Sequence, residues 1–195
     1  MNPDIQPDTT DSVARRTELI IGLAVVLVIV GIIVGIVLVV SNTNPRIVYE
    51  PAKACQLLTL DEAGSLLGGS VQKSGVTDVV VKGDLATSKC GYTDGNPSED
   101  EVIVAAIIVR SGINDKGIAQ NKSEFAAGKP TTDVEDVTDL GDSAYFNKAK
   151  GQLNILNGKD WIILSYGVAS EPKENSLDDA ILIGRSVVDA PGVKF

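Results

Sequence analysis

The hydrophobic pattern begins with one long apolar run, from Leu19 to Val40, with the sequence LIIGLAVVLVIVGIIVGIVLVV. The run has no charged or hydroxyl side chain, so it lacks the polar stripe that a helix on the surface of a soluble core presents to water. As a helix it would reach roughly 33 Å, at about 1.5 Å per residue, enough to cross a hydrocarbon core of about 30 Å. We therefore predict a transmembrane helix over residues 18–41.

The flanks of this run predict its orientation. Arg15 and Arg16 precede it, whereas the polar segment that follows carries only Arg46 nearby. Positive charge favours the cytoplasmic side, so residues 1–17 are predicted to be a disordered cytoplasmic tail, with the remainder of the chain extracytoplasmic. The run is longer than the core of a signal peptide and no A-x-A site follows it, which favours an uncleaved signal anchor in the cell membrane over a cleaved signal peptide.

Beyond a predicted linker over residues 42–52, the pattern of apolar positions indicates a folded domain over residues 53–195. Thr59-x-x-Glu62 is a capping box followed by apolar residues at helical spacing, which predicts a first helix. The last helix is predicted to begin near Ser176, because two aspartates in its first turn would complement the helix dipole.

Other apolar stretches predict strands. Residues 76–81 are rich in valine, and a short strand is predicted around Cys90 and Tyr92. Residues 102–109, VIVAAIIV, predict a strand that is buried on both faces. A helix is predicted over about residues 115–127. Asn157-Gly158 separates two apolar runs and predicts a hairpin with a tight turn, in which both residues have positive φ. The predicted order α-β-β-β-α-β-β-β-α, with short turns between strands, indicates an α+β domain with helices packed on an antiparallel sheet.

The chain contains two cysteines, Cys55 and Cys90. In an extracytoplasmic setting such a pair indicates a disulfide. Closing a loop of about 35 residues would stabilise the fold by roughly 3–4 kcal/mol in the chain-entropy model. A metal site is not expected, because the chain has no histidine and two thiols alone cannot complete a tetrahedral zinc site.

Composition argues against several classes of function. Acidic side chains number 26 and basic ones 17, a net charge of −9 that suits neither nucleic acid nor anionic lipid headgroups. Without histidine, no Ser-His-Asp or Cys-His arrangement can exist, and paired cysteines would leave no thiol nucleophile. We therefore predict that the protein is not an enzyme and that it uses no cofactor.

The acidic segment Asp94–Glu101 imitates a calcium-binding loop. It offers oxygen ligands at alternating positions, but Glu99 stands where glycine is required and Ala105 where a bidentate glutamate is required. A solvated turn between strands is therefore the favoured interpretation, with cation binding left open.

Two further motifs have both a functional and an ordinary interpretation. Asn121-Lys122-Ser123 is a glycosylation sequon, which a bacterial origin would leave unused. Gly31-x-x-x-Gly35 is a candidate helix–helix interface, although glycines are common in membrane helices.

The segment CQLLTLDEAGSLLG, from Cys55 to Gly68, resembles the start of small uncharacterised domains in bacterial, mainly actinobacterial, cell-envelope lipoproteins. In that group a second cysteine is followed at two residues by an aromatic, as in Cys90-Gly-Tyr92, and a later segment is similar to VTDLGDSAY at residues 137–145. The resemblance covers roughly residues 55–188 and implies an envelope location, the fold and the disulfide. This chain departs from the group in having a helix in place of the lipid anchor.

The sequence leaves two functions open, because the resembling group has no established shared activity. The first is a membrane-anchored extracytoplasmic domain that binds or senses a small ligand or an envelope component, a role attributed to related envelope domains. The alternative is an accessory or structural subunit whose partner is another membrane protein, which the short inner tail and the Gly31/Gly35 pair favour. Both place the protein in the membrane, and neither involves nucleic acid.

Overall fold

The structure of the chain is a computed structural model. It describes residues 46–67, 71–94, 102–168 and 175–190. The predicted tail, the predicted transmembrane helix and the Gly31/Gly35 pair lie outside these ranges. None of the helices in the ranges has the length and apolarity that a membrane crossing requires.

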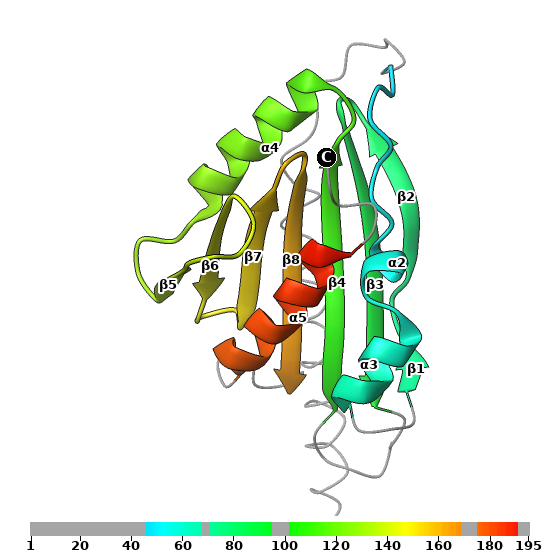
Figure 1. Cartoon of the computed structure of the whole chain (residues 1–195), viewed down its shortest axis with the longest axis vertical. Helices are drawn as coiled ribbons and strands as arrows, with labels where there is room; N and C mark the ends of the chain where they lie inside the picture. Colours follow the sequence, from blue (N-terminus) through cyan, green and yellow to red (C-terminus); the bar gives the residue numbers. More distant parts are fainter. Residues whose placement is uncertain (1–45, 68–70, 95–101, 169–174, 191–195) are drawn as a thin grey trace, which may run out of the picture. The chain divides into compact units, whose positions relative to one another are not determined.

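An antiparallel sheet of eight strands forms the centre of the described domain (Figure 1). Its order is β1-β3-β4-β8-β7-β6-β5, and β2 also pairs with β3. The strands are β1 (Val71–Lys73), β2 (Thr77–Lys82), β3 (Leu85–Asp94), β4 (Ile103–Gly112), β5 (Val134–Val137), β6 (Ser143–Asn147), β7 (Gln152–Asn157) and β8 (Asp160–Val168). The predicted antiparallel α+β fold is confirmed.

Helices cover the two faces of the sheet unequally (Figure 1). The helices are α2 (Ala54–Leu57), α3 (Leu60–Leu67), α4 (Asp115–Gly128) and α5 (Leu177–Asp189). Helices α2, α3 and α5 pack on one face, where their apolar side chains join the main core. Helix α4 packs on the opposite face over a smaller cluster.

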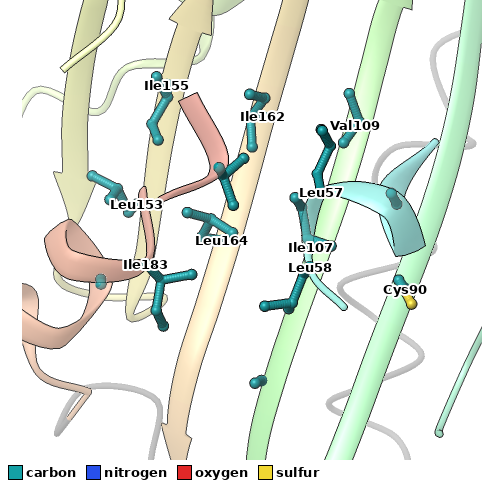
Figure 2. Close-up of a cluster of buried hydrophobic side chains, with 14 of the residues drawn as sticks. Leu57, Leu58, Cys90, Ile107, Val109, Leu153, Ile155, Ile162, Leu164 and Ile183 are labelled. Carbon is teal, nitrogen blue, oxygen red and sulfur yellow. The ribbon is translucent and has the colours of Figure 1, made fainter. Parts of the chain in front are cut away.

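The main core lies between the sheet and helices α2, α3 and α5 (Figure 2). Successive side chains of a strand point to opposite faces, so every second residue of the central strands enters this core. Ile107, Val109, Leu153, Ile155 and Ile162 are all 0% exposed. The helices contribute side chains that include Leu57 from α2 and Ile183 from α5. Complete burial of such large side chains makes this core the main source of hydrophobic stabilisation.

The cluster beneath α4 is aromatic. The Phe125 ring lies 5.1 Å from that of Tyr145 and 6.0 Å from that of Trp161, measured between centroids. The guanidinium of Arg110 lies 5.7 Å from the centre of the Trp161 ring. Burial raises the pKa of the Tyr145 phenol to about 12. This face therefore combines aromatic packing with a cation.

Both predicted helix starts are confirmed. The backbone N–H of Thr59 donates to Glu62 Oε2 at 2.8 Å, and the N–H of Glu62 donates to Thr59 Oγ1 at 3.3 Å, which completes the capping box. The Ser176 hydroxyl oxygen accepts a hydrogen bond from the N–H of Asp179 at 3.3 Å. The helix predicted over residues 115–127 is α4.

The hairpin between β7 and β8 is confirmed, but the prediction for its turn is wrong. Asn157 pairs with Asp160, so the turn residues are Gly158 and Lys159. Gly158 has φ 57°, whereas neither Asn157 nor Lys159 has a positive φ. A type II′ turn requires a positive φ only at its first central residue, and the glycine occupies that position.

The sheet also differs from the prediction around β4. Residues such as Ala105 and Ile107 are buried, but the alternate residues of β4 are only partly buried, so the strand is not buried on both faces. The physical reason is that α4 is the one helix on that face among the described elements. In addition, β3 has ten residues where a short strand was expected. Helix α2 was not predicted, and the described part of the chain has eight strands where the predicted order has six.

Candidate functional site

The segment before the first cysteine lies on the domain as a strap, which we define as residues 48–54. The backbone N–H groups of Val48 and Tyr49 donate to Ile113 O at 2.8 and 3.1 Å. The Tyr49 hydroxyl donates to Asp115 Oδ1 at 2.9 Å. Part of the segment predicted as a linker is therefore bonded to the domain.

Two serines on the core face of the sheet hold the rest of the strap. The N–H of Ala52 donates to Ser111 Oγ at 3.0 Å, and the N–H of Ala54 donates to Ser88 Oγ at 3.0 Å. The Ser88 hydroxyl in turn donates to Ala52 O at 2.9 Å. These bonds satisfy backbone groups that a chain lying over a buried sheet would otherwise leave unpaired.

The strap leads directly into the predicted disulfide, which is confirmed. Cys55 Sγ and Cys90 Sγ are 2.04 Å apart, and the two Cα atoms are 5.1 Å apart. The bond joins α2 to the middle of β3. Because the chain has no other cysteine, no thiol remains for nucleophilic chemistry.

A buried polar cluster lies next to the strap. Lys159 and Asp160 are 6% and 0% exposed, and Lys159 Nζ lies 3.4 Å from Asp160 Oδ2. Burial raises the pKa of the Asp160 carboxyl, while Ser111 and Lys159 stabilise its ionised form and oppose the rise. Since Ser111 also accepts the strap's N–H from Ala52, one hydroxyl links the strap to the buried carboxylate.

The surroundings of Lys159 and Asp160 indicate a structural role for this cluster. Asp160 Oδ1 and Asn121 Oδ1 are buried without a hydrogen-bond partner within the described part of the chain. A buried carboxylate with a raised pKa is also a feature of active sites. Here, however, Asp160 is fully buried, and the hollows around Leu60 and around residues 136–144 are lined by other residues. We interpret the cluster as the junction that fixes the strap to the β4–α4 corner and the β7–β8 turn.

The sequon asparagine is buried. Asn121 is 0% exposed, and its Nδ2 donates to Arg110 O at 2.7 Å and to Lys159 O at 2.9 Å. A glycan on Nδ2 would need both of these hydrogen bonds to break. The side chain is thus a structural bridge between α4 and the ends of β4 and the β7–β8 turn.

The acidic calcium-like segment is described only at its first residue. Asp94 Oδ1 accepts a hydrogen bond from the N–H of Ile103 at 3.1 Å, and residues 95–101 lie outside the described ranges. Among the residues that are described, no group of three or more carboxylate, cysteine or histidine side chains is arranged to hold a metal ion.

The motifs behind the family resemblance occupy positions with structural demands. A Cβ on Gly91 would lie 2.4 Å from Ser74 O, so only glycine fits between the cysteine and the aromatic. The hydroxyl of that aromatic, Tyr92, donates to Leu58 O at 2.9 Å. These contacts connect the β1–β2 region and the α2–α3 connection to β3.

The second motif, around residues 137–145, has a similar explanation. Leu140 is a buried core residue. Gly141 has φ 62°, and a Cβ at this position would lie only 2.6 Å from Leu156 O. Asp142 Oδ2 accepts a hydrogen bond from the N–H of Gly158 at 2.9 Å and so supports the β7–β8 turn. Leu140, Gly141 and Asp142 therefore each have a role in the fold.

The hollows of the described surface are shallow and open to solvent. One, of about 410 Å³, is lined by Leu60, Asp61, Gly64, Ser65 and Val71. Another, of about 340 Å³, is lined by residues 136–144. The space between α5 and the sheet is filled, because a Cβ on Gly184 of α5 would already lie 3.0–3.1 Å from core side chains. This packing contrasts with the enclosed apolar pocket of a typical small-ligand site.

Exposed apolar side chains gather on one edge of the sheet, which we call the valine edge. It consists of Val76, Val80 and Val81, which are 47%, 56% and 39% exposed. The β2–β3 register shifts between Thr77 and Val80, and charged residues flank the valines. Bulges and edge charges disfavour the addition of another strand, so this edge is suited to side-chain contacts.

The comparisons with known proteins add no assignment to these features. No protein-family model, curated protein or solved structure matches the chain. The resemblance to domains of envelope lipoproteins therefore stays a prediction that rests on the motifs quoted above.

Sequence reasoning missed the strap and the Lys159–Asp160 pair. Both residues follow Asn157-Gly158 in a tight turn, where charged side chains are usually exposed. Their burial depends on the strap and α4, which come from distant parts of the sequence, so no local pattern marks it. No pattern in the sequence marks Ser88 and Ser111, the two serines that hold the strap.

Proposed function

We propose that the protein is a membrane-anchored extracytoplasmic binding domain of the cell envelope, and that its ligand is another envelope protein contacted through its surface. The observation that carries this proposal is the filled interior of the domain combined with the exposed valine edge. Exposed apolar side chains along an edge strand, on a domain whose described hollows are open to solvent, favour contact with a protein partner.

The anchor in this proposal is the predicted transmembrane helix of residues 18–41, with the N-terminus in the cytoplasm. The Cys55–Cys90 bond supports the extracytoplasmic location, because disulfides persist in oxidising compartments. The strap places the start of the folded domain at Val48, seven residues after the predicted anchor in the sequence, since its backbone is hydrogen-bonded to Ile113 from there onward.

The proposal is tested by photo-crosslinking of the full chain in native membranes. A photoreactive amino acid replaces Val80 on the valine edge, and in the matched control it replaces Leu182, which is 64% exposed on α5. We expect a discrete protein adduct from position 80 and none from position 182. Absence of an adduct at position 80, or the same adducts from both positions, would contradict the proposal.

The alternative, an accessory subunit assembled through its membrane helix, is separated by a second variant. The substitutions G31L and G35L remove the candidate close-packing surface of that helix. An adduct at position 80 that persists in this double variant shows that the outer domain makes the contact. Loss of the adduct would favour the accessory-subunit alternative.

A further inference from the structure

The strap joins the sheet at one end. We call this the strap end and define it by Val48, the turn at Gly83-Asp84 and the corner at Ile113. Val48 N–H donates to Ile113 O at 2.8 Å, and Ile113 N–H donates to Asp84 O at 3.1 Å. The first bonded residue of the described domain is therefore held at this end.

The reach of the chain limits how the domain can stand on the membrane. Six residues, 42–47, separate the proposed anchor from Val48. At about 3.3–3.6 Å per extended residue they span roughly 20 Å. Strand β4 runs from Ile103 at the far end to Gly112 at the strap end, and its ten residues extend about 33 Å. The tether is thus too short for the far end of the sheet to rest on the membrane.

The strap end also carries side chains suited to a lipid surface. Ile47 and Val48 are 54% and 58% exposed, and Arg46 and Lys116 are exposed beside them. Aliphatic side chains partition into the interfacial region of a bilayer, and cationic side chains can pair with headgroup phosphates. Asp84 and Asp115 lie at the same end, so the exposed aliphatic pair, and not net charge, favours contact with a membrane there.

We propose that the strap end is the membrane-facing surface of the domain, with the lipid surface of the anchor's own membrane as its occupant. The proposal rests on the anchor in the proposed function. It deepens that function, because it directs the far end of the sheet away from the bilayer and leaves the valine edge at the side of the domain, accessible to an envelope protein.

The test uses the full chain in phosphatidylcholine and phosphatidylglycerol vesicles that carry brominated acyl chains, which quench nearby tryptophan. The lone tryptophan is first removed as W161F. Into this background V48W places the probe at the strap end, and the matched control V102W places it at a site 42% exposed just before β4, at the far end. We expect loss of V48W emission relative to unbrominated vesicles and unchanged V102W emission.

The outcomes separate this inference from the anchor itself. Vesicle flotation first shows whether the chain is membrane-bound, and a chain that stays in the soluble fraction contradicts the proposed anchor. A floating chain with unquenched V48W, or with equal quenching at both positions, overturns the assignment of the strap end. Hydrogen exchange of the unsubstituted chain gives a second readout: residues 82–84 should exchange more slowly in vesicles than in detergent solution, and residues 102–104 should exchange equally in both.

Discussion

The two faces of the sheet are held in different ways. On one face, α2, α3 and α5 cover an apolar core in which side chains such as Leu153 are 0% exposed, and a disulfide joins α2 to β3. On the other face, α4 is held by the aromatic cluster around Phe125, by the two hydrogen bonds of Asn121 and by the ion pair of Arg110 with Glu124.

This difference predicts different sensitivities. Apolar burial contributes in proportion to the area removed from water, and a cross-link acts mainly by restricting the unfolded chain. Hydrogen bonds and ion pairs depend on direction and ionisation, so they respond to single polar changes and to pH. We therefore expect the face covered by α2, α3 and α5 to contribute most of the free energy of unfolding. Substitutions of polar side chains and changes of pH should act mainly through the face covered by α4.

The largest effect is expected from a cavity in the main core. Leu153→Ala should lower the free energy of unfolding by about 4 kcal/mol, because it removes buried methyl groups and leaves a void. Phe125→Ala, beneath α4, should cost about 3 kcal/mol. Leu182→Ala is the control: its side chain is 64% exposed, so a change within about 0.5 kcal/mol is expected. Denaturant unfolding of the full chain in detergent measures all three, and a larger loss for Phe125→Ala than for Leu153→Ala would contradict the comparison.

The disulfide gives the next effect. The double variant C55A/C90A should be less stable by about 3 kcal/mol, since the loop that the bond closes regains its freedom in the unfolded state. Unfolding under non-reducing conditions compares this variant with the unsubstituted chain. Under reducing conditions the difference should largely disappear, and a difference that remains would mean that the lost packing of the two sulfur atoms is responsible.

Asn121 tests the second face alone. Asn121→Ala should cost about 2 kcal/mol, because the buried carbonyl oxygens of Arg110 and Lys159 each lose a donor. The matched control is Lys122→Ala, one residue further along α4 and exposed to solvent, which should be close to neutral. Equal stability of the two variants would show that these hydrogen bonds do not hold α4.

What the sequence could predict depends on how far apart the interacting residues are. The capping box joins Thr59 to Glu62, three residues away, and the β7–β8 hairpin joins runs separated by one turn, so local patterns were enough for both. The pairing of Cys55 with Cys90 spans 35 residues, yet it was predictable because the chain offers no other partner.

The strap and the buried pair depend on contacts that no local pattern contains. Val48 bonds to Ile113, and the side chain of Asn121 reaches Lys159, 38 residues away. Burial on each face of β4 depends likewise on where α4 lies, which is why a continuously apolar strand proved to be only partly covered. The elements were thus largely predictable, whereas the site, which is formed between elements, was not.

The smallest expected effect is a difference in pH dependence between two carboxylates. The hydrogen bond from Arg110 lowers the pKa of Glu124, so its contribution to stability is present above the unfolded value of 4.5 and is lost as the pH falls through the folded pKa. The Glu124 side chain is 37% exposed, so we expect less than about 1 kcal/mol. Burial raises the pKa of Asp160, so above pH 3.8 the folded state binds more protons at this carboxyl than the unfolded state does. The stability that depends on protonated Asp160 therefore decreases as the pH rises from 3.8 through the folded pKa.

Variants that cannot ionise isolate the two contributions. Glu124→Gln should remove the part of the stability that is lost on acidification below 4.5, and Asp160→Asn should remove the part that is gained on acidification from neutral pH. Only the slopes of stability against pH are compared, because Asp160→Asn also changes the surroundings of Lys159. Unfolding free energies of the full chain between pH 3 and 7 provide these slopes. Slopes of the same sign for both carboxylates would mean that Asp160 is better solvated or more strongly paired than its burial beside the strap implies.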